Sequence, residues 1–244
     1  MMTFYEWQMT LARPILPVLP HLVNREIRRL VRGSGVAQPK LLDVGGRKSP
    51  YTIGVAADVT VSDIPRESEV QEQLHLGFTD QILRNLQRRR SNIVNVVLED
   101  MCRSAQPSDH FDGVVSIEVI EHVPDDEAFV AQIARVIKPG GWLFLTTPNG
   151  DYVKNEPPNY NPDHLRHYPK AALADLLSRY FRDVRVDYAI QTGKHRARGG
   201  KGIKLSRPLH SAGTIVSNVA SHFESRGTSN EPRRMAHLIA VAKK

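Results

Sequence analysis

The chain of 244 residues has the length of one α/β domain, and its 41% of hydrophobic residues can fill a sizeable core. Its formal net charge of +7 favours acidic partners, such as phosphate groups, nucleic acid or anionic lipid headgroups. The single cysteine, Cys102, excludes an intramolecular disulfide and a cysteine-based metal cluster. The sequence lacks an apolar run of about 18 residues and a signal-peptide pattern at its start. We therefore expect a cytoplasmic protein without a transmembrane helix.

Residues 1–36 are predicted to form a helical cap. Three prolines interrupt an amphipathic pattern, so we expect one short helix before Pro14 and another from about His21 to Val31. The second helix carries four arginines opposite an apolar stripe: Arg25, Arg28, Arg29 and Arg32. The simplest interpretation is a solvated helix face above the core. The alternatives are a lid over a substrate or a surface that rests on anionic lipid.

Residues 37–244 alternate short apolar runs with helical patterns. The predicted strands cover residues 40–44, 56–63, 93–98, 112–117, 142–146, 183–188 and 237–242. The predicted helices cover residues 67–89 with a break near 77, then 125–137, 170–180 and 208–224. This alternation indicates a mostly parallel sheet covered by helices on both faces.

Two segments, at about 151–168 and 193–234, are predicted insertions. Within the second, residues 193–207 are rich in Lys, Arg and Gly, and we expect a loop there. Such a loop is either a solvated connection or a contact for a phosphorylated, sulfated or lipid-linked substrate.

Acidic residues end three successive predicted strands. Asp43 ends the first and precedes Gly45 and Gly46, which let the chain turn sharply and let a ligand approach the backbone. Asp63 lies twenty residues further on, where a carboxylate can bind ribose hydroxyls. Asp100 ends the third strand and, with Met101 beside it, can bind an adenine ring. Each acid could instead cap a helix, but ligands of open α/β sheets bind at this edge.

The segment FDGVVSIEVIEHVPD, residues 111–125, resembles the fourth-strand signature of class I S-adenosylmethionine (AdoMet)-dependent methyltransferases. The resemblance is strongest to the branch with the ubiquinone-biosynthesis O-methyltransferases and the type 11 enzymes. Further matches follow in order, at residues 138–141 (KPGG), 147–149 (TPN) and 163–168 (DHLRHY). The resemblance covers roughly residues 38–190.

This resemblance implies a doubly wound, Rossmann-like sheet of seven mostly parallel strands, with the last strand antiparallel. It also implies roles for residues around the cofactor AdoMet. Asp43, Gly45 and Gly46 would lie at its methionine end, and Ser116 beside its amino group. Asp63 would bind the ribose, and Asp100 and Met101 the adenine. One departure concerns the family turn D-x-G-x-G-x-G, in which Arg47 and Ser49 replace the two later glycines.

His122 and His164 are the candidate bases for removing a proton from an acceptor hydroxyl, because histidine titrates near neutral pH. His164 could instead form a loop hydrogen bond that holds Arg166 and Tyr168. The run Glu118-x-x-Glu121-His122 has been linked to a divalent cation in the ubiquinone branch. It also occurs in relatives without metal, so we expect no metal and a structural or substrate-facing role.

We therefore predict a methyltransferase that acts on a small-molecule, glycan or lipid-linked acceptor, at oxygen. Peripheral membrane contact is compatible with the basic charge, whereas nucleic acid is disfavoured because aromatic residues do not interleave the basic ones. One alternative is an inactive methyltransferase fold that binds nucleic acid or an anionic membrane surface. Another, a nicotinamide-dependent oxidoreductase, lacks its G-x-G-x-x-G motif. The acceptor and the oligomeric state stay open.

Overall fold

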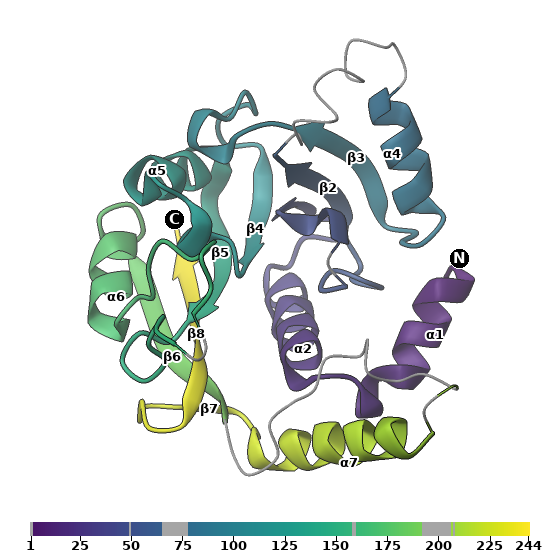
Figure 1. Ribbon diagram of the computed structural model, residues 1–244. Coiled ribbons are helices and arrows are strands. Elements are labelled where there is room, and N and C mark those ends of the chain that lie inside the picture. Colours follow the sequence, from purple (N-terminus) through teal and green to yellow (C-terminus); the bar gives the residue numbers. More distant parts are fainter. Residues whose placement is uncertain (1, 49, 65–77, 158–159, 192–205, 207) are drawn as a thin grey trace.

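The computed structural model describes residues 2–48, 50–64, 78–157, 160–191, 206 and 208–244. They form a twisted sheet with the strand order β3-β2-β1-β4-β5-β8-β6-β7 (Figure 1). The strands are β1 (Lys40–Val44), β2 (Asp58–Asp63), β3 (Ile93–Leu98), β4 (Phe111–Ile117), β5 (Ile137–Pro148), β6 (Asp183–Gln191), β7 (Thr228–Ser229) and β8 (Met235–Lys243).

The topology confirms a mostly parallel sheet with an antiparallel last strand. Strands β1 to β5 pair in parallel, whereas β8 runs antiparallel between β5 and β6. The sheet has eight strands instead of the seven predicted, because the two-residue β7 pairs with the edge strand β6. Residues 225–234 were expected to be a loop, since so short a polar strand has no hydrophobic periodicity to reveal it.

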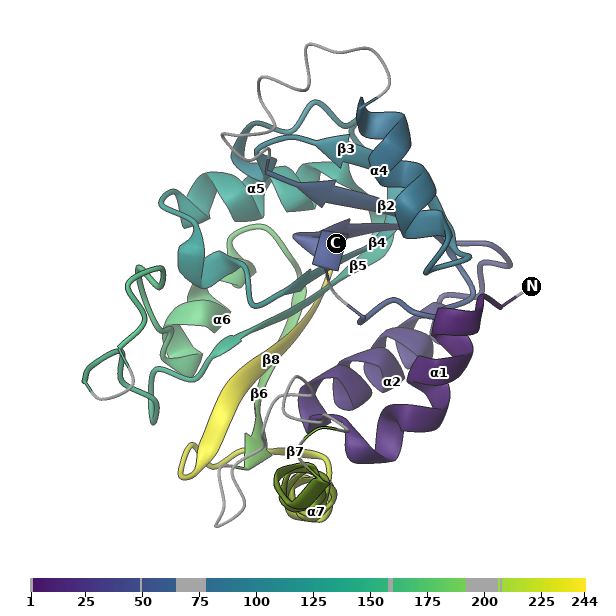
Figure 2. The same cartoon turned by 45° about the vertical axis from the view of Figure 1, so that its right-hand side comes forward.

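Helices cover both faces of the sheet, as predicted. They are α1 (Phe4–Ala12), α2 (Val18–Gly33), α4 (Phe78–Gln87), α5 (Asp126–Val136), α6 (Lys170–Ser178) and α7 (Pro208–Glu224). Adjacent residues of a strand point to opposite faces, so Leu42 packs with α5 and α6 while Leu41 packs with α2 and α4. Figures 1 and 2 show these two helical layers on either side of the strands.

The amino-terminal helices break at the prolines, as expected. A short 3-10 turn, η1 (Arg13–Ile15), separates α1 from α2. Helix α2 begins three residues earlier than predicted, because Pro20 lies in its first turn, where a missing N–H costs no hydrogen bond. The apolar stripe of α2 is buried against the sheet, which agrees with a solvated arginine face above the core.

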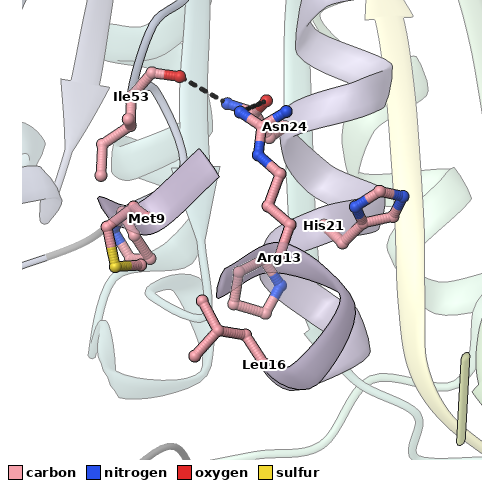
Figure 3. Close-up of a pocket in the computed structure, with 8 residues that line it drawn as sticks. Met9, Arg13, Leu16, His21, Asn24 and Ile53 are labelled. Carbon is pink, nitrogen blue, oxygen red and sulfur yellow. Dashed lines mark hydrogen bonds between the residues drawn. The ribbon is translucent and has the colours of Figure 1, made fainter. Parts of the chain in front are cut away.

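Asn24 fastens α2 to the loop after β1. Its Nδ2 donates to the backbone oxygen of Ile53, and its Oδ1 accepts from Arg13 (Figure 3). Nδ2 also donates to the backbone oxygen of Tyr51. The cavity drawn there has a volume of about 20 Å³. Asn24 thus bonds to Arg13 and to the loop backbone, and the cavity is a packing feature of the helical cap.

The carboxy-terminal half matches the predicted elements closely. Helix α7 has the predicted bounds, and β6 extends three residues further than expected. The predicted loop at residues 193–207 falls almost wholly outside the described residues. In the part of the chain that the structure describes, none of the helices is long and apolar enough to cross a membrane.

Candidate active site

A pocket opens at the carboxyl ends of β1, β2 and β3, where the sheet topology brings the three strand ends together. It is lined by four of the predicted cofactor residues, Gly45, Asp63, Asp100 and Met101, together with Ser62 and Phe129. Its enclosed volume is about 70 Å³, enough for one part of a cofactor. Ser62 is buried, and its Oγ has no hydrogen-bond partner among the described residues. An unsatisfied hydroxyl in a pocket wall is available to a ligand.

The turn after β1 requires both of its glycines. Gly45 has a φ of +70°, and a Cβ on it would lie 2.8 Å from Cγ2 of Val119. A Cβ on Gly46 would lie 2.3 Å from Cγ of Asp43. The chain then enters the 3-10 turn η2 (Gly46–Lys48), and Arg47 Nε lies 3.6 Å from Asp63 Oδ2. Arg47, one of the two departures from the family turn, thus reaches toward the ribose-binding candidate; Ser49 lies outside the described residues.

Asp43 lies behind this turn instead of lining the pocket. Its Oδ2 accepts from Thr52 Oγ1 at 2.9 Å and is 3.3 Å from Arg90 Nη1. Arg90 is 2% exposed, and its Nη2 also donates to the carbonyl oxygen of Gly46 at 2.9 Å. The buried ion pair therefore holds the glycine turn in place.

Arg90 is the last of three consecutive arginines, at residues 88–90, and the sequence did not single it out as a buried residue. The two arginines that precede it, Arg88 and Arg89, are exposed, although all three residues have the same side chain. The sequence carries no signal that separates the buried one from the other two.

The other cofactor candidates also have structural contacts. Asp63 Oδ1 accepts from the backbone amide of Ile64, and Asp100 Oδ1 caps the 3-10 turn η3 (Met101–Arg103) through Cys102 N. The capping interpretation of Asp100 is therefore right, and the same residue also lines the pocket. Ser116 is buried beside Val44 in the sheet register, with no partner for its Oγ among the described residues.

A second group of polar residues lies where β4, β5 and β8 meet. Glu118 has a φ of +55°, accepts from Thr146 Oγ1 at 2.8 Å and forms an ion pair with His237 Nδ1 at 3.1 Å. Burial acts to raise the pKa of Glu118, but His237 and Thr146 outweigh it and keep that pKa below its usual value. Such backbone strain is typical of functional sites. His237 could not be singled out from the sequence, because a histidine at the start of a terminal strand carries no motif.

Glu121, in the 3-10 turn η4 (Ile120–His122), is fully buried. Its Oε2 accepts from Thr147 Oγ1 at 3.0 Å, and Oε1 has no partner among the described residues. Burial, followed by the negative charge of Glu118, raises the pKa of Glu121 to about 8. Glu121 is therefore largely protonated at neutral pH and can donate a hydrogen bond.

The two predicted bases, His122 and His164, lie together. Their ring centroids are 4.7 Å apart in an edge-to-face arrangement. His122 Nδ1 lies 2.7 Å from the carbonyl oxygen of Asp163. A carbonyl can only accept, so Nδ1 carries the proton and Nε2 of the neutral ring is the basic atom. This tautomer is the one a general base needs.

His164 is oriented by a similar chain of contacts. His167 Nδ1 lies 2.8 Å from the carbonyl oxygen of Val153, so its Nε2 is the acceptor for His164 Nδ1, also at 2.8 Å. The basic atom of His164 is thus Nε2. Burial, then the neighbouring His122 and His167, lower the pKa of His164. The described hydrogen bond of the His164 ring goes to His167, and Arg166 instead donates to Tyr168 and to the carbonyl oxygen of Pro124.

One donor atom from each of Glu121, His122 and His164 lies within 4.8 Å of the others. Such a mixed oxygen and nitrogen set suits a divalent transition metal, and the carbonyl behind His122 resembles the outer contacts of metal-bound histidines. These residues fit the cation linked to the ubiquinone branch. The expectation of a metal-free site stays a prediction.

Comparison with known proteins places this geometry in a family. A family model described as "Methyltransferase domain" matches residues 18–182. The ubiquinone biosynthesis O-methyltransferase of Thiobacillus denitrificans is 34% identical over 117 residues, which cover 47% of this chain and 46% of that protein. The corresponding enzyme of Albidiferax ferrireducens is 29% identical over 167 residues, covering 62% and 61%. The chain thus spans roughly half the length of these relatives.

Solved structures show the same fold. A SAM-dependent methyltransferase from Thermotoga maritima, described as a possible histamine N-methyltransferase, superposes with a TM-score of 0.57 at 14% identity, covering 91% of this chain and 92% of that one. Phosphoethanolamine N-methyltransferase 2 of Haemonchus contortus, in complex with S-adenosyl-L-methionine, gives a TM-score of 0.57 at 15% identity over 90% and 52% of the two chains. The chain therefore belongs to the methyltransferase-domain family.

Proposed function

We propose that this chain transfers a methyl group from AdoMet to an oxygen atom of a small-molecule acceptor. The observation that carries the proposal is the pocket at the carboxyl edge of the sheet, where Gly45, Asp63, Asp100 and Met101 converge. Ligands of doubly wound sheets bind at this edge. In the proposed arrangement, Asp63 receives the ribose hydroxyls, and Asp100 and Met101 hold the adenine.

The methionine end of AdoMet would lie over the glycine turn. The backbone of Gly45 and Gly46 approaches it, while Asp43 acts through Arg90 and the turn instead of through direct contact. The unpartnered hydroxyls of Ser62 and Ser116 supply hydrogen bonds to the amino acid part. Bound in this way, AdoMet would present its methyl group toward the ends of β4 and β5.

The acceptor would bind at those strand ends, between Glu118 and the paired histidines. AdoMet supplies an electrophilic methyl group on a positively charged sulfur. The acceptor oxygen forms a bond to the methyl carbon, the carbon–sulfur bond breaks, and its electron pair stays on the sulfur. The hydroxyl proton goes to Nε2 of His122 or His164. Alignment of the acceptor oxygen with the methyl carbon and exclusion of water from the site contribute the rest of the rate enhancement.

Calorimetry with AdoMet and S-adenosylhomocysteine tests the cofactor site. Asp63→Asn and Asp100→Asn each remove a charged acceptor of roughly 1.5–3 kcal/mol, so each should weaken binding about tenfold or more. Asp58→Asn is the matched control, because Asp58 lies at the opposite end of the same strand as Asp63. Unchanged affinity in both variants, or an equal loss in the control, would refute the placement of the cofactor.

A methyl-donor assay against phenolic, glycan and lipid-linked acceptors tests the acceptor class. Transfer to a phenolic or other small hydroxyl compound supports the proposal, and transfer solely to amines would overturn the assignment to oxygen. The O-methyltransferase relatives support oxygen as the acceptor atom. The inactive binding module is not favoured, because the chain matches the family model and also has a pocket lined by the predicted cofactor residues.

A further inference from the structure

Helix α7 is amphipathic in the opposite sense to a normal surface helix. Its buried residues are small and polar: Ser211, Thr214, Asn218 and Ser221. Three of its large apolar residues point outward, with Leu209 90%, Val216 63% and Phe223 63% exposed, whereas Ile215 and Val219 are half-buried. These three lie seven residues apart and so form one line along the helix. A surface helix normally buries its apolar stripe against the core.

The polar inner face of α7 has a structural reason. The carbonyl groups that end η1 need donors, because the turn leaves them without partners. Asn218 Nδ2 donates to the oxygen of Ile15 at 2.9 Å, and His222 Nε2 lies 2.8 Å from the oxygen of Leu16. The packing of α7 on η1 therefore explains why the inner face of α7 is polar. It gives no reason for the apolar outer side, and contiguous exposed patches of a few hundred Å² mark contact surfaces.

A basic groove adjoins the apolar line. It lies between α2 and the end of α7, has a volume of about 450 Å³, and is lined by His21, Arg25, His222, Phe223 and Arg226. The Arg226 guanidinium lies 4.9 Å from the centre of the Phe223 ring. Arg25 pairs with Glu26, an acid that is absent from the groove lining. Cationic side chains beside exposed apolar ones can bind a lipid bilayer, in which anionic headgroups cover an apolar layer.

A second apolar face lies close by, on α1. Phe4, Trp7 and Leu11 are exposed there, and the rings of Phe4 and Trp7 stack at 6.2 Å. Helices α1 and α7 both contact η1 at the periphery of the molecule, and α7 also contacts β6 (Figures 1 and 2). Tryptophan and phenylalanine beside arginines are typical of helices that lie in a lipid interface.

We propose that the outer face of α7, with the basic groove beside it, docks on an anionic lipid bilayer. A second copy of this chain is the less suitable occupant, because α7 carries one acidic residue, Glu224, and no basic residue besides histidine. It therefore lacks the flanking charge pairs that set the register between paired helices. The end of α7 is fastened to the end of β6, where Ser225 Oγ accepts from Gln191 N. Docking thus brings the carboxyl edge of the sheet to the membrane.

Co-sedimentation with phosphatidylcholine vesicles, with and without phosphatidylglycerol, tests the proposal. The wild-type chain should bind the anionic vesicles. Val216→Ser with Phe223→Ser should weaken this binding at least about tenfold, since two buried apolar side chains are lost. Arg25→Gln with Arg226→Gln should remove the preference for phosphatidylglycerol. The matched control, Val36→Ser with Val94→Ser, changes two exposed apolar residues elsewhere and should bind as the wild type does.

Three results would overturn the proposal. One is a wild-type chain that fails to bind anionic vesicles, and another is an equal loss in the control variant. The third is a dimer in solution that does not bind vesicles and that dissociates when Val216→Ser and Phe223→Ser are introduced. A second copy of the chain would then cover α7. Calorimetry with AdoMet on the same variants separates this surface from the cofactor site, which should keep its affinity. The membrane proposal and the methyl-transfer proposal can therefore fail independently.

Discussion

Replacing Arg90 with methionine should destabilise the protein far more than any other change in the arginine run at residues 88–90. Arg90→Met leaves the carboxylate of Asp43, which is 1% exposed, buried without its cationic partner. Removing one member of a buried ion pair costs about 3–5 kcal/mol. For a chain of this length, that corresponds to a fall in Tm of roughly 10 °C. The free energy of unfolding is measured by urea denaturation, and the affinity for AdoMet by calorimetry.

Two further variants make this prediction refutable. Arg88→Met changes an exposed neighbour and should cost under about 0.5 kcal/mol. Asp43→Asn in the Arg90→Met background removes the buried negative charge and should recover part of the stability, because a neutral side chain is cheaper to bury than a charged one. Equal losses for Arg88→Met and Arg90→Met, or no recovery in the double variant, would show that the ion pair does not hold the glycine turn.

Three more predictions concern Glu121, His164 and Gly46. Glu121→Gln should leave the free energy of unfolding unchanged near pH 5 and raise it by a few kcal/mol at pH 9, as measured by urea denaturation. The folded pKa of Glu121, about 8, exceeds the unfolded value of 4.5, so the stability of the wild-type protein falls as pH rises between these two values. If His164 is the base, kcat/KM should decline as pH drops through its lowered pKa, and His164→Gln should abolish this limb while His110→Gln keeps it. Gly46→Ala should push Asp43 away and weaken AdoMet binding about tenfold or more, whereas Gly213→Ala, with open space around it, should not.

The pocket at the strand ends could be predicted from the sequence, because parallel strands place their carboxyl ends along one edge. Asp63, Asp100 and Met101 each follow a strand whose apolar run is readable, so their meeting follows from topology alone. The glycine turn was readable for the same reason. Its departure from the family pattern was visible too, but the contact of Arg47 with Asp63 was not.

The sequence by itself determined the class of fold, the positions of most strands along the chain and the family, since hydrophobic periodicity and motif spacing are local properties of the chain. Tertiary structure alone decided which charges are buried and which face of a helix is outside. Arg90 meets Asp43 across 47 residues, and His237 meets Glu118 across 119. The inverted face of α7 depends on two carbonyl groups some 200 residues away. Such contacts arise from packing between distant segments, for which a local pattern holds no information.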